Sequence, residues 1–470
     1  MDLDRITDSI ARRVEKTQSS AAEFFEPTIR LGVTGLSRAG KTVFITGLIS
    51  NLLNRGRMPQ LSAHREGRIE AVYLQPQPDM ILPRFDYETH LAALLGPEPR
   101  WPDSTRSISE LRLSFRLKPR SWLRGLTGPR ILHLDIIDYP GEWLLDLPLM
   151  EKSYSRWSED TFEQMARQPF AHPFLAALKA VDGGAPMDEG KAQNLAHDFT
   201  TYLHRARAEG WTDCTPGRFL LPGDLAGSPV LTFAPVTRPA DTPRNSLWRE
   251  MERRYVAYGS KVVAPFFRDH FARLDRQVVL MDVLGAIDQG PQAVEELRRV
   301  MAEILSAFRI GQNGWLSSLI GRRRIERILF AATKADHLHH EQHPALSAIT
   351  EALVEEARTR SKYAGAEVSA LALAGLRATV EEVTERNGQR LPAVRGRLLS
   401  SDRQAVMYPG TLPDDPARIL HPARQGAETW LDAEYSLMRF APARMSLSPR
   451  EGLPHIRLDR AIEFLIGDQL

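Results

Sequence analysis

A loop that could hold a nucleotide phosphate runs from Gly35 to Thr42. Its sequence, Gly-Leu-Ser-Arg-Ala-Gly-Lys-Thr, fits the pattern G-x-x-x-x-G-K-[ST] at every required position. In such a loop, backbone N–H groups point at the α- and β-phosphates, a lysine neutralises charge at the β- and γ-phosphates, and a hydroxyl binds Mg²⁺. The predicted phosphate site consists of Gly35, Ser37, Arg38, Ala39, Gly40, Lys41, Thr42 and Val43.

A second motif, Asp138-Tyr139-Pro140-Gly141, follows the apolar run "ILHLDII". At this position Asp138 can reach Mg²⁺ through a water, and the backbone N–H of Gly141 can contact a γ-phosphate. A strand that ends in Asp-x-Pro-Gly is also an ordinary turn. Its place after the phosphate loop favours the nucleotide site, with Asp138 as a second metal ligand beside Thr42.

The segment Thr333-Lys334-Ala335-Asp336 could identify the base. A carboxylate can accept two hydrogen bonds from guanine N1–H and N2–H₂, a pair of donors that adenine does not present. The stem of Lys334 could lie along the base plane. Alternatively, Asp336 caps a helix that starts after it. Further along the chain, a backbone N–H could reach guanine O6 from Ser369, Ala370 and Leu371.

The elements around these motifs predict an α/β fold. Thr28–Gly35 predicts a strand that enters the phosphate loop, and a helix follows from Thr42 to Asn54. Later strands alternate with helices, which predicts a mainly parallel sheet. Further strands are expected at 69–74, 110–117, 131–138, 277–287, 325–336 and 365–375, and further helices at 87–95, 190–210, 290–308, 351–363 and 459–466.

Length and composition exclude several classes of protein. A chain of 470 residues is longer than one hydrophobic core usually supports, so we expect a large domain with sizeable insertions. A net charge of +2 does not favour nucleic acid as a partner. The single cysteine, Cys214, excludes an internal disulfide, the charged N-terminus is not typical of a signal peptide, and no apolar run reaches the roughly 18 residues of a membrane span. We therefore expect a cytoplasmic protein.

The order of the motifs resembles that of translation-factor-related GTPases. More narrowly, "GLSRAGKTVFITGLI", "WPDST", "DYPGEWLLDLPL" and "FAATKADH" are similar to segments of the YcjX-like family of bacterial stress-associated GTPases, and the likeness covers nearly the whole chain. This resemblance implies binding of GTP and GDP with Mg²⁺, and hydrolysis of GTP, on a P-loop G domain with a helical insertion. It also implies a link to envelope stress and a protein partner at the inner membrane.

The resemblance and the element pattern together predict how the chain is divided. Leu3, Ile6, Ile10 and Val14 follow helical spacing, so an amphipathic helix is expected first, packed on the body or touching a membrane. A basic stretch at Arg322–Arg324 could also meet an anionic surface. The expected units are an N-terminal helix (1–28), a G domain in two parts (29–150 and 271–387), a helical insertion (151–270) and a C-terminal extension packed on the G domain (388–470).

Three residues are candidates for closing the site and driving hydrolysis. In the family, the first switch lies where "WPDSTRSISEL" stands, so Thr105 is the candidate third metal ligand, with Ser104 and Ser107 as competitors. Ras-like GTPases orient water with a glutamine where this chain has Glu142, which could act as a base or face away. Arg38 could supply transition-state charge in cis or be a solvated arginine. The expected catalytic set is Lys41, Thr105, Glu142 and Arg38.

Three functions stay open at this point. The first is a Mg²⁺-dependent GTPase that acts as a stress-linked switch or assembly factor, the second a GTP- and GDP-binding scaffold with little hydrolysis, and the third an ATP-dependent ATPase or kinase. The histidines of "DHLHHEQH" (337–343) do not form H-E-x-x-H, so the sequence does not favour a metal site there. The oligomeric state is left open.

Overall fold

The computed structural model describes residues 26–35, 39–103, 107–119, 129–211, 213–307, 325–363, 366–386, 388–430 and 434–470. Several predicted features lie outside these residues: the N-terminal helix, Ser37, Arg38, Ser104, Thr105 and Arg322–Arg324. Among the described helices, none is both long and apolar enough to cross a membrane.

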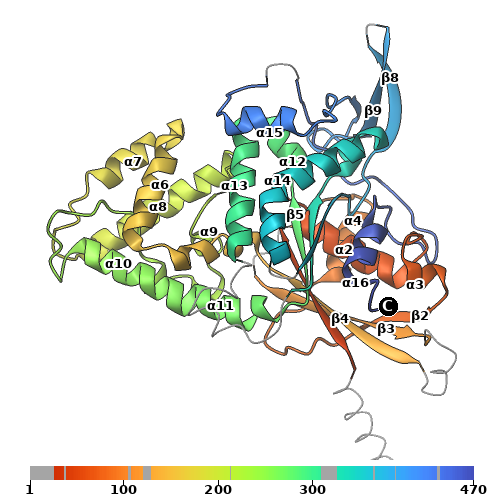
Figure 1. Cartoon of the computed structure of the whole chain (residues 1–470), viewed down its shortest axis with the longest axis horizontal. Coiled ribbons are helices and arrows are strands. Elements are labelled where there is room, and N and C mark those ends of the chain that lie inside the picture. Colours follow the sequence, from red (N-terminus) through yellow and green to blue (C-terminus); the bar gives the residue numbers. More distant parts are fainter. Residues whose placement is uncertain are drawn as a thin grey trace, which may run out of the picture.

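The centre of the molecule is a seven-stranded sheet with the order β2-β3-β4-β1-β5-β6-β7 (Figure 1). β1 pairs in parallel with β4 and β5, and β6 and β7 continue the parallel arrangement, whereas β3 is antiparallel to both β4 and β2. The predicted α/β P-loop fold class with a mainly parallel sheet is confirmed. The strands are β1 (Thr28–Gly35), β2 (Ile69–Gln75), β3 (Ser109–Leu117), β4 (Arg130–Asp138), β5 (Arg276–Met281), β6 (Arg327–Ala332) and β7 (Glu367–Ala372).

Helices cover both faces of the sheet, as Figure 1 shows. The helices of the described residues, including those of the helical region beside the sheet, are α2 (Lys41–Asn54), α3 (Ser62–Arg65), α4 (Tyr87–Leu95), α5 (Gly141–Leu144), α6 (Tyr154–Ala166), α7 (His172–Lys179), α8 (Glu189–Ala208), α9 (Gly217–Leu220), α10 (Leu247–Tyr258), α11 (Ala264–Asp269), α12 (Val283–Gln289), α13 (Pro291–Ala307), α14 (His343–Tyr363), α15 (Ala417–Arg424) and α16 (Leu458–Ile466).

Strand β5 explains why there are two hydrophobic cores. Because successive side chains of a strand point to opposite faces, Val278 and Leu280 pack into the core that contains α2 and α16. Val279 and Met281 enter the other core, which continues into the helical region between residues 151 and 270. That region is drawn in yellow and green on the left of Figure 1. Its limits as a separate unit stay a prediction.

Aromatic side chains fill the interior of the helical region. Trp157 stacks on Tyr255 with ring centroids 5.2 Å apart, and Phe233 meets Phe219 edge to face at 4.9 Å. Trp157 and Phe233 are almost fully buried. Such rings bury a large apolar area with little loss of side-chain entropy, so these helices have a core of their own that joins the sheet.

A close backbone contact fixes α2 against the loop that follows β7. A Cβ atom added to Gly47 would lie 2.2 Å from the carbonyl oxygen of Gly375, and one added to Gly375 would lie 2.7 Å from Cα of Phe44. Real side chains essentially never reach such distances, so both positions require glycine. The helix behind the phosphate loop and the loop after β7 therefore pack backbone against backbone.

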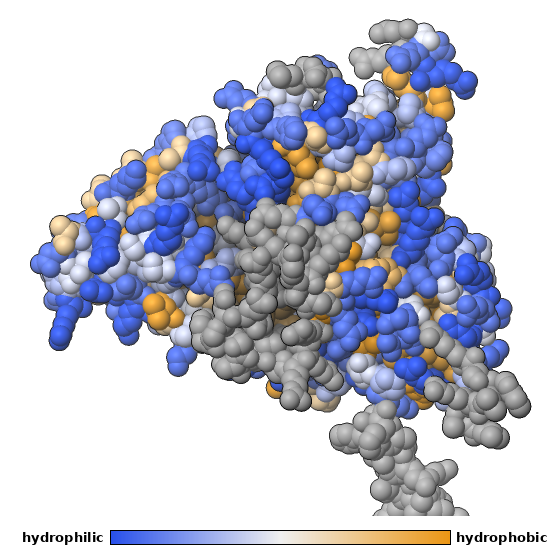
Figure 2. All heavy atoms as spheres, in the orientation of Figure 1, coloured by the Kyte–Doolittle hydropathy of each residue, from blue (hydrophilic) through white to orange (hydrophobic). Residues whose placement is uncertain are grey.

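The C-terminal part contains a second sheet that the sequence pattern did not predict. β8 (Val380–Arg386), β9 (Gln389–Arg397) and β10 (Gln404–Met407) form it, in the order β10-β9-β8. The predicted boundary at 387 and 388 lies between β8 and β9, which pair with each other, and it stays a prediction. Charged residues in β8 weaken the alternation that marks a strand. Val380 and Val383 are exposed on this hairpin, and Figure 2 shows hydrophobic spheres among hydrophilic ones at its end.

The strand predicted at 277–287 is shorter than expected. β5 ends at Met281, and the Asp282 side chain accepts a hydrogen bond of 3.0 Å from the N–H of Gly285 as the N-cap of α12. The apolar run continues from the strand into the helix, so periodicity alone does not reveal the boundary. The cap residue is the local signal that was available.

Candidate nucleotide-binding site

The turn into α2 has the backbone geometry that a phosphate loop requires. Gly40 is left-handed, with φ of 74°, and its carbonyl accepts from the N–H of Phe44. A Cβ atom at Gly35 would lie 2.9 Å from Cβ of Leu280, so glycine is needed where β1 ends. Ala39 is buried and Val43 is half-buried beside this turn. The backbone at Gly35, where β1 ends, and at Gly40, before α2, therefore favours glycine.

Lys41 is already engaged by the end of the neighbouring strand. Its Nζ lies 2.7 Å from Oδ1 of Asp138 and donates to the carbonyl oxygen of Tyr139. The pairing of β1 with β4 causes this arrangement, because Val33 is level with Asp138. The Asp138 side chain is only 1% exposed, so Lys41 neutralises a buried carboxylate.

Thr42 connects the phosphate loop to the segment that precedes Thr105. Its hydroxyl donates to the carbonyl oxygen of Asp103 at 3.5 Å, and Thr46 donates back to the carbonyl of Thr42 at 2.8 Å. The predicted switch segment therefore starts next to the phosphate loop. Its candidate Thr105 lies outside the described residues, and Ser107 is exposed.

Glu142 is held by the helical region. Its Oε1 lies 2.7 Å from Nη2 of Arg207, which is in the last turn of α8. A Cβ atom added to Gly217 would lie 2.0 Å from the carbonyl oxygen of Glu142, so the backbone is also packed tightly. The Glu142 side chain is only 9% exposed. Both Gly141 and Glu142 thus start a buried helix, α5, that the helical region fixes in place.

Further contacts extend this attachment along the segment after Gly141. The guanidinium of Arg218 lies 3.1 Å from the ring centroid of Trp143. Asp146 accepts a hydrogen bond of 2.6 Å from the N–H of Gly217 and another from the hydroxyl of Tyr258. Burial raises the pKa of Asp146 to about 7, although these hydrogen bonds act in the opposite direction.

At the other end of the site, Asp336 lies in the short 3-10 helix η8 (Ala335–His337) after β6. Its Oδ2 accepts from the N–H of Ala378 at 3.0 Å, and its carbonyl oxygen accepts from the hydroxyl of Thr379. Burial alone would raise the pKa of Asp336, but the nearby His337 and the Ala378 N–H hold it below its usual range. The carboxylate therefore contacts a distant loop rather than capping the next helix.

Thr333 and Lys334 are fixed by the end of β5. The backbone N–H and the hydroxyl of Thr333 both donate to the carbonyl oxygen of Met281, at 2.9 and 3.2 Å. Lys334 is left-handed, with φ of 60°, and its Nζ forms an ion pair with Asp282. The contact with Asp282 could not be predicted from a sequence motif, because Asp282 stands inside an apolar run.

The second predicted base-contacting segment, 369–371, lies within a strand, and its role in contacting the base stays a prediction. Ser369, Ala370 and Leu371 lie inside β7, level with residues 329–331 of β6. The loop that reaches Asp336 is 373–379, two residues later, because the apolar run continues through the end of the strand. Ala374 in this loop exchanges two hydrogen bonds of 3.0 Å with Ile456, so the C-terminal segment holds it.

The two ends of the site lie along the same edge of the sheet. Asp138 ends β4 and Asp336 follows β6, with β1 and β5 between them. At about 4.8 Å between strands, three steps span about 14 Å. Ligands of open α/β sheets bind outside the carboxyl ends of the strands, which fits an elongated ligand along this edge.

A cavity elsewhere has different chemistry. It has a volume of about 560 Å³, lies between α6 and α13 and is lined by residues such as Trp157, Glu296 and Arg299. Its lining includes none of the predicted phosphate, metal or base residues. Those residues lie at the edge of the sheet instead.

Comparisons with known proteins agree with this arrangement. The sequence profile described as the YcjX-like family, DUF463, matches residues 29–470. A protein of Escherichia coli named Ras-like GTPase YcjX is 38% identical over 456 residues, covering 94% of this chain and 96% of that protein. A protein of the same name from Shewanella oneidensis is 33% identical over 488 residues, covering 98% and 99%.

Proposed function

We propose that this chain, which belongs to the YcjX-like family, is a Mg²⁺-dependent GTPase that binds GTP and hydrolyses it to GDP and phosphate. The names of the two relatives support a GTPase. The observation that carries the proposal is the contact of Lys41 with Asp138 and Tyr139 at adjoining strand ends. This contact supports the proposal, because a lysine at the position expected to bind phosphate lies beside the carboxylate that a nucleotide-bound metal would use.

The oxygen atoms at the phosphate end fit a hard divalent cation. Thr42 offers a hydroxyl and Asp138 a carboxylate, and Mg²⁺ prefers oxygen ligands together with water and substrate phosphates. Thr105 would complete the set on the predicted switch. The metal would neutralise charge on the phosphates. Lys41 would exchange its contact with Asp138 for phosphate oxygens when the nucleotide binds, and Gly141 would offer its N–H to the γ-phosphate.

Asp336 has the charge and the acceptor capacity to select guanine. Its pKa lies below the usual range, so it is ionised at neutral pH. A carboxylate has about four lone-pair positions, and Ala378 uses one of them. Asp336 can therefore keep its contact with Ala378 and accept from guanine N1–H and N2–H₂. Loop 373–379 is then the source of any N–H directed at guanine O6.

Competitive binding of GTP and ATP to the full-length chain tests this assignment. We expect the wild-type protein to prefer GTP, and Asp336→Ala to lose that preference while it retains binding through the phosphates. Thr333→Ser, which keeps a hydroxyl next to the motif, is the matched control and should retain the preference. Equal binding of GTP and ATP by the wild-type protein would contradict the proposal and favour an ATPase.

A second candidate is a GTP- and GDP-binding scaffold that hydrolyses GTP slowly. The contact of Glu142 with Arg207 favours it, because it holds one carboxylate oxygen on the guanidinium and away from an attacking water. Single-turnover release of phosphate from bound GTP separates the two candidates. Release of phosphate before the bound nucleotide dissociates supports the GTPase, whereas GTP that dissociates intact supports the scaffold.

The family resemblance adds a biological setting to the proposal. It implies a stress-linked switch or assembly factor in the cytoplasm with a protein partner or a peripheral contact at the inner membrane. A pull-down that compares the GTP-bound and GDP-bound chain tests this part. A partner retained in only one nucleotide state supports a switch, and identical sets of proteins in both states count against it.

A further inference from the structure

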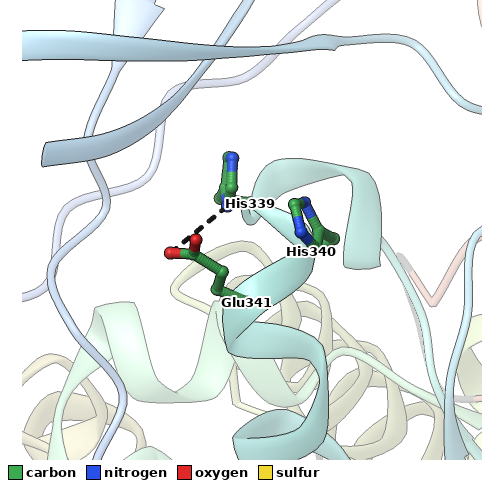
Figure 3. Close-up of side chains that lie close together, drawn as sticks. All are labelled: His339, His340 and Glu341. Atoms are coloured by element: carbon green, nitrogen blue, oxygen red, sulfur yellow. Dashed lines mark ion pairs between the residues drawn. The ribbon is translucent and has the colours of Figure 1, made fainter.

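A cluster of histidine and glutamate side chains follows Asp336 along the chain. His339 precedes the 3-10 helix η9 (His340–Gln342), and His340 and Glu341 are its first two residues. One ligand atom from each of these three residues lies within 4.8 Å of the other two. Figure 3 shows His339 and Glu341 facing each other with His340 beside them.

The buried histidine of the cluster has an unpaired ring nitrogen. Among the described residues, no atom forms a hydrogen bond with Nδ1 of His339, although the side chain is 90% buried. A buried polar group left without a hydrogen bond is destabilising. Glu341 Oε2 is 3.6 Å from this nitrogen, too far for a hydrogen bond. At bond lengths of about 2.0–2.1 Å, two ligands of a tetrahedral Zn²⁺ ion stand roughly 3.4 Å apart. A bound ion would therefore satisfy the nitrogen with little movement.

A second carboxylate, Glu381 of β8, orients the imidazole of His340 and lies near that of His339 without a hydrogen bond to it. Its Oε2 is 2.7 Å from Nδ1 of His340 and 3.8 Å from Nε2 of His339. Arg377 holds the other carboxylate oxygen of Glu381 at 3.2 Å. Metal-binding histidines usually donate their second ring N–H to a carboxylate, which fixes the ring and the tautomer. This arrangement leaves Nε2 of His340 and Nδ1 of His339 as the nitrogens that can bind a cation.

We propose that His339, His340 and Glu341 bind a Zn²⁺ ion, with Glu381 positioning the imidazole of His340. Imidazole and carboxylate ligands suit Zn²⁺, and three protein ligands leave a fourth position for water. The side chain of His340 is 64% exposed, so water can reach that position. The ion would attach the segment after Asp336 to the three-stranded sheet.

The sequence did not predict this site, because the motif H-E-x-x-H applies only to ligands on one continuous helix. H-E-x-x-H places two histidines one helical turn apart. Here His339 is extended, with φ of −63° and ψ of 148°, and η9 starts only at the next residue. The change from extended to helical backbone lets neighbouring residues in the chain direct their side chains to one point.

Isothermal titration calorimetry of the full-length chain with Zn²⁺ tests the proposal. We expect the wild-type protein to bind one ion per chain at this site, and His340→Ala and Glu341→Gln to weaken that binding more than about 100-fold, beyond the loss usual for a positioning residue. Both side chains are exposed, so both variants should fold. Glu381→Gln should weaken binding by about 10- to 100-fold.

His197→Ala, an exposed histidine on α8 far along the chain from the cluster, is the matched control and should bind Zn²⁺ like the wild-type protein. Unchanged stoichiometry and affinity in both His340→Ala and Glu341→Gln would overturn the proposal. So would a wild-type protein that takes up no Zn²⁺.

Discussion

The two ends of the candidate nucleotide site are held by different parts of the chain. At the phosphate end, Arg207 and Gly217 of the helical region fix the segment after Gly141. At the base end, loop 373–379 fixes Asp336, and the C-terminal segment holds that loop. Each accessory part therefore contacts one end of the candidate site: the helical region contacts the end proposed for hydrolysis, and the C-terminal segment contacts the loop at the end proposed for base recognition.

The largest expected effect is on the pH dependence of stability, to which buried Asp146 at the phosphate end and buried Asp336 at the base end contribute with opposite signs. Because the pKa of Asp146 is raised to about 7, its contribution to stability is present below its ordinary pKa and is lost as the pH rises through 7. A difference of that size corresponds to at most about 4 kcal/mol. The pKa of Asp336 is lowered in the folded protein. Its contribution to stability is therefore present at neutral pH and is lost as the pH falls through that lowered pKa.

Urea unfolding of the wild-type protein and Asp146→Asn between pH 4 and pH 8 measures this effect. We expect the stability advantage of the wild-type protein over the variant to shrink as the pH rises. Glu110, whose pKa is also raised to about 7, chiefly by burial, is present in both proteins and cancels. If the stability advantage of the wild-type protein over Asp146→Asn grew with pH, Asp146 would not be neutral where the helical region buries it.

Removal of the phosphate-binding lysine should have the next largest effect. Lys41→Ala loses a charged hydrogen bond to the phosphates, which corresponds to about 1.5–3 kcal/mol, or a roughly 10- to 150-fold weaker affinity for GTP. The affinity for ATP should fall by the same factor, because Lys41 lies at the phosphate end. Titration with each nucleotide checks this, and a loss confined to GTP would break the separation of the two ends.

Arg207→Ala should change hydrolysis without changing the choice of base. Freed from the guanidinium, Glu142 can act on the attacking water, and we expect a single-turnover rate about tenfold higher, a small part of what a general base can contribute. Arg205→Ala, an exposed arginine on the same helix, is the control and should leave the rate unchanged. A changed preference between GTP and ATP in Arg207→Ala would contradict the comparison.

The smallest expected effect concerns the base end. Thr379→Val removes the hydroxyl that donates to the carbonyl oxygen of Asp336. A neutral hydrogen bond contributes about 0.5–1.5 kcal/mol, so the affinity for GTP should fall roughly 2- to 12-fold. Thr379→Ser keeps the hydroxyl and should bind like the wild-type protein. The rate of hydrolysis of bound GTP should be unchanged in both, and a slower rate in Thr379→Val would link the two ends.

The sequence predicted the features that depend on local patterns. The phosphate loop, the acidic motif after it and the fold class follow from motifs and from the alternation of strands and helices. Lys41 and Asp138 are 97 positions apart, yet Asp138 ends one predicted strand and Lys41 closes the loop that leaves another, and parallel strands bring such ends together. A contact of this kind can be inferred from the order of the strands.

Contacts made by single side chains from distant loops could not be predicted in this way. Arg207 looks like any basic residue in the last turn of a helix, and nothing near it in the sequence indicates Glu142 as a partner. Ala378 binds Asp336 through its backbone N–H, which every residue except proline carries. The ends of β5 and β7 were missed because apolar residues continue past both strands, so the period of the pattern does not change there.

The contact between Gly47 and Gly375 has a mechanical consequence. Neither glycine leaves room for a side chain, so α2 and the loop that contacts Asp336 cannot slide past each other. A methyl group at either position would push the two apart. If the proposed function is correct, both halves of nucleotide recognition would then be lost together.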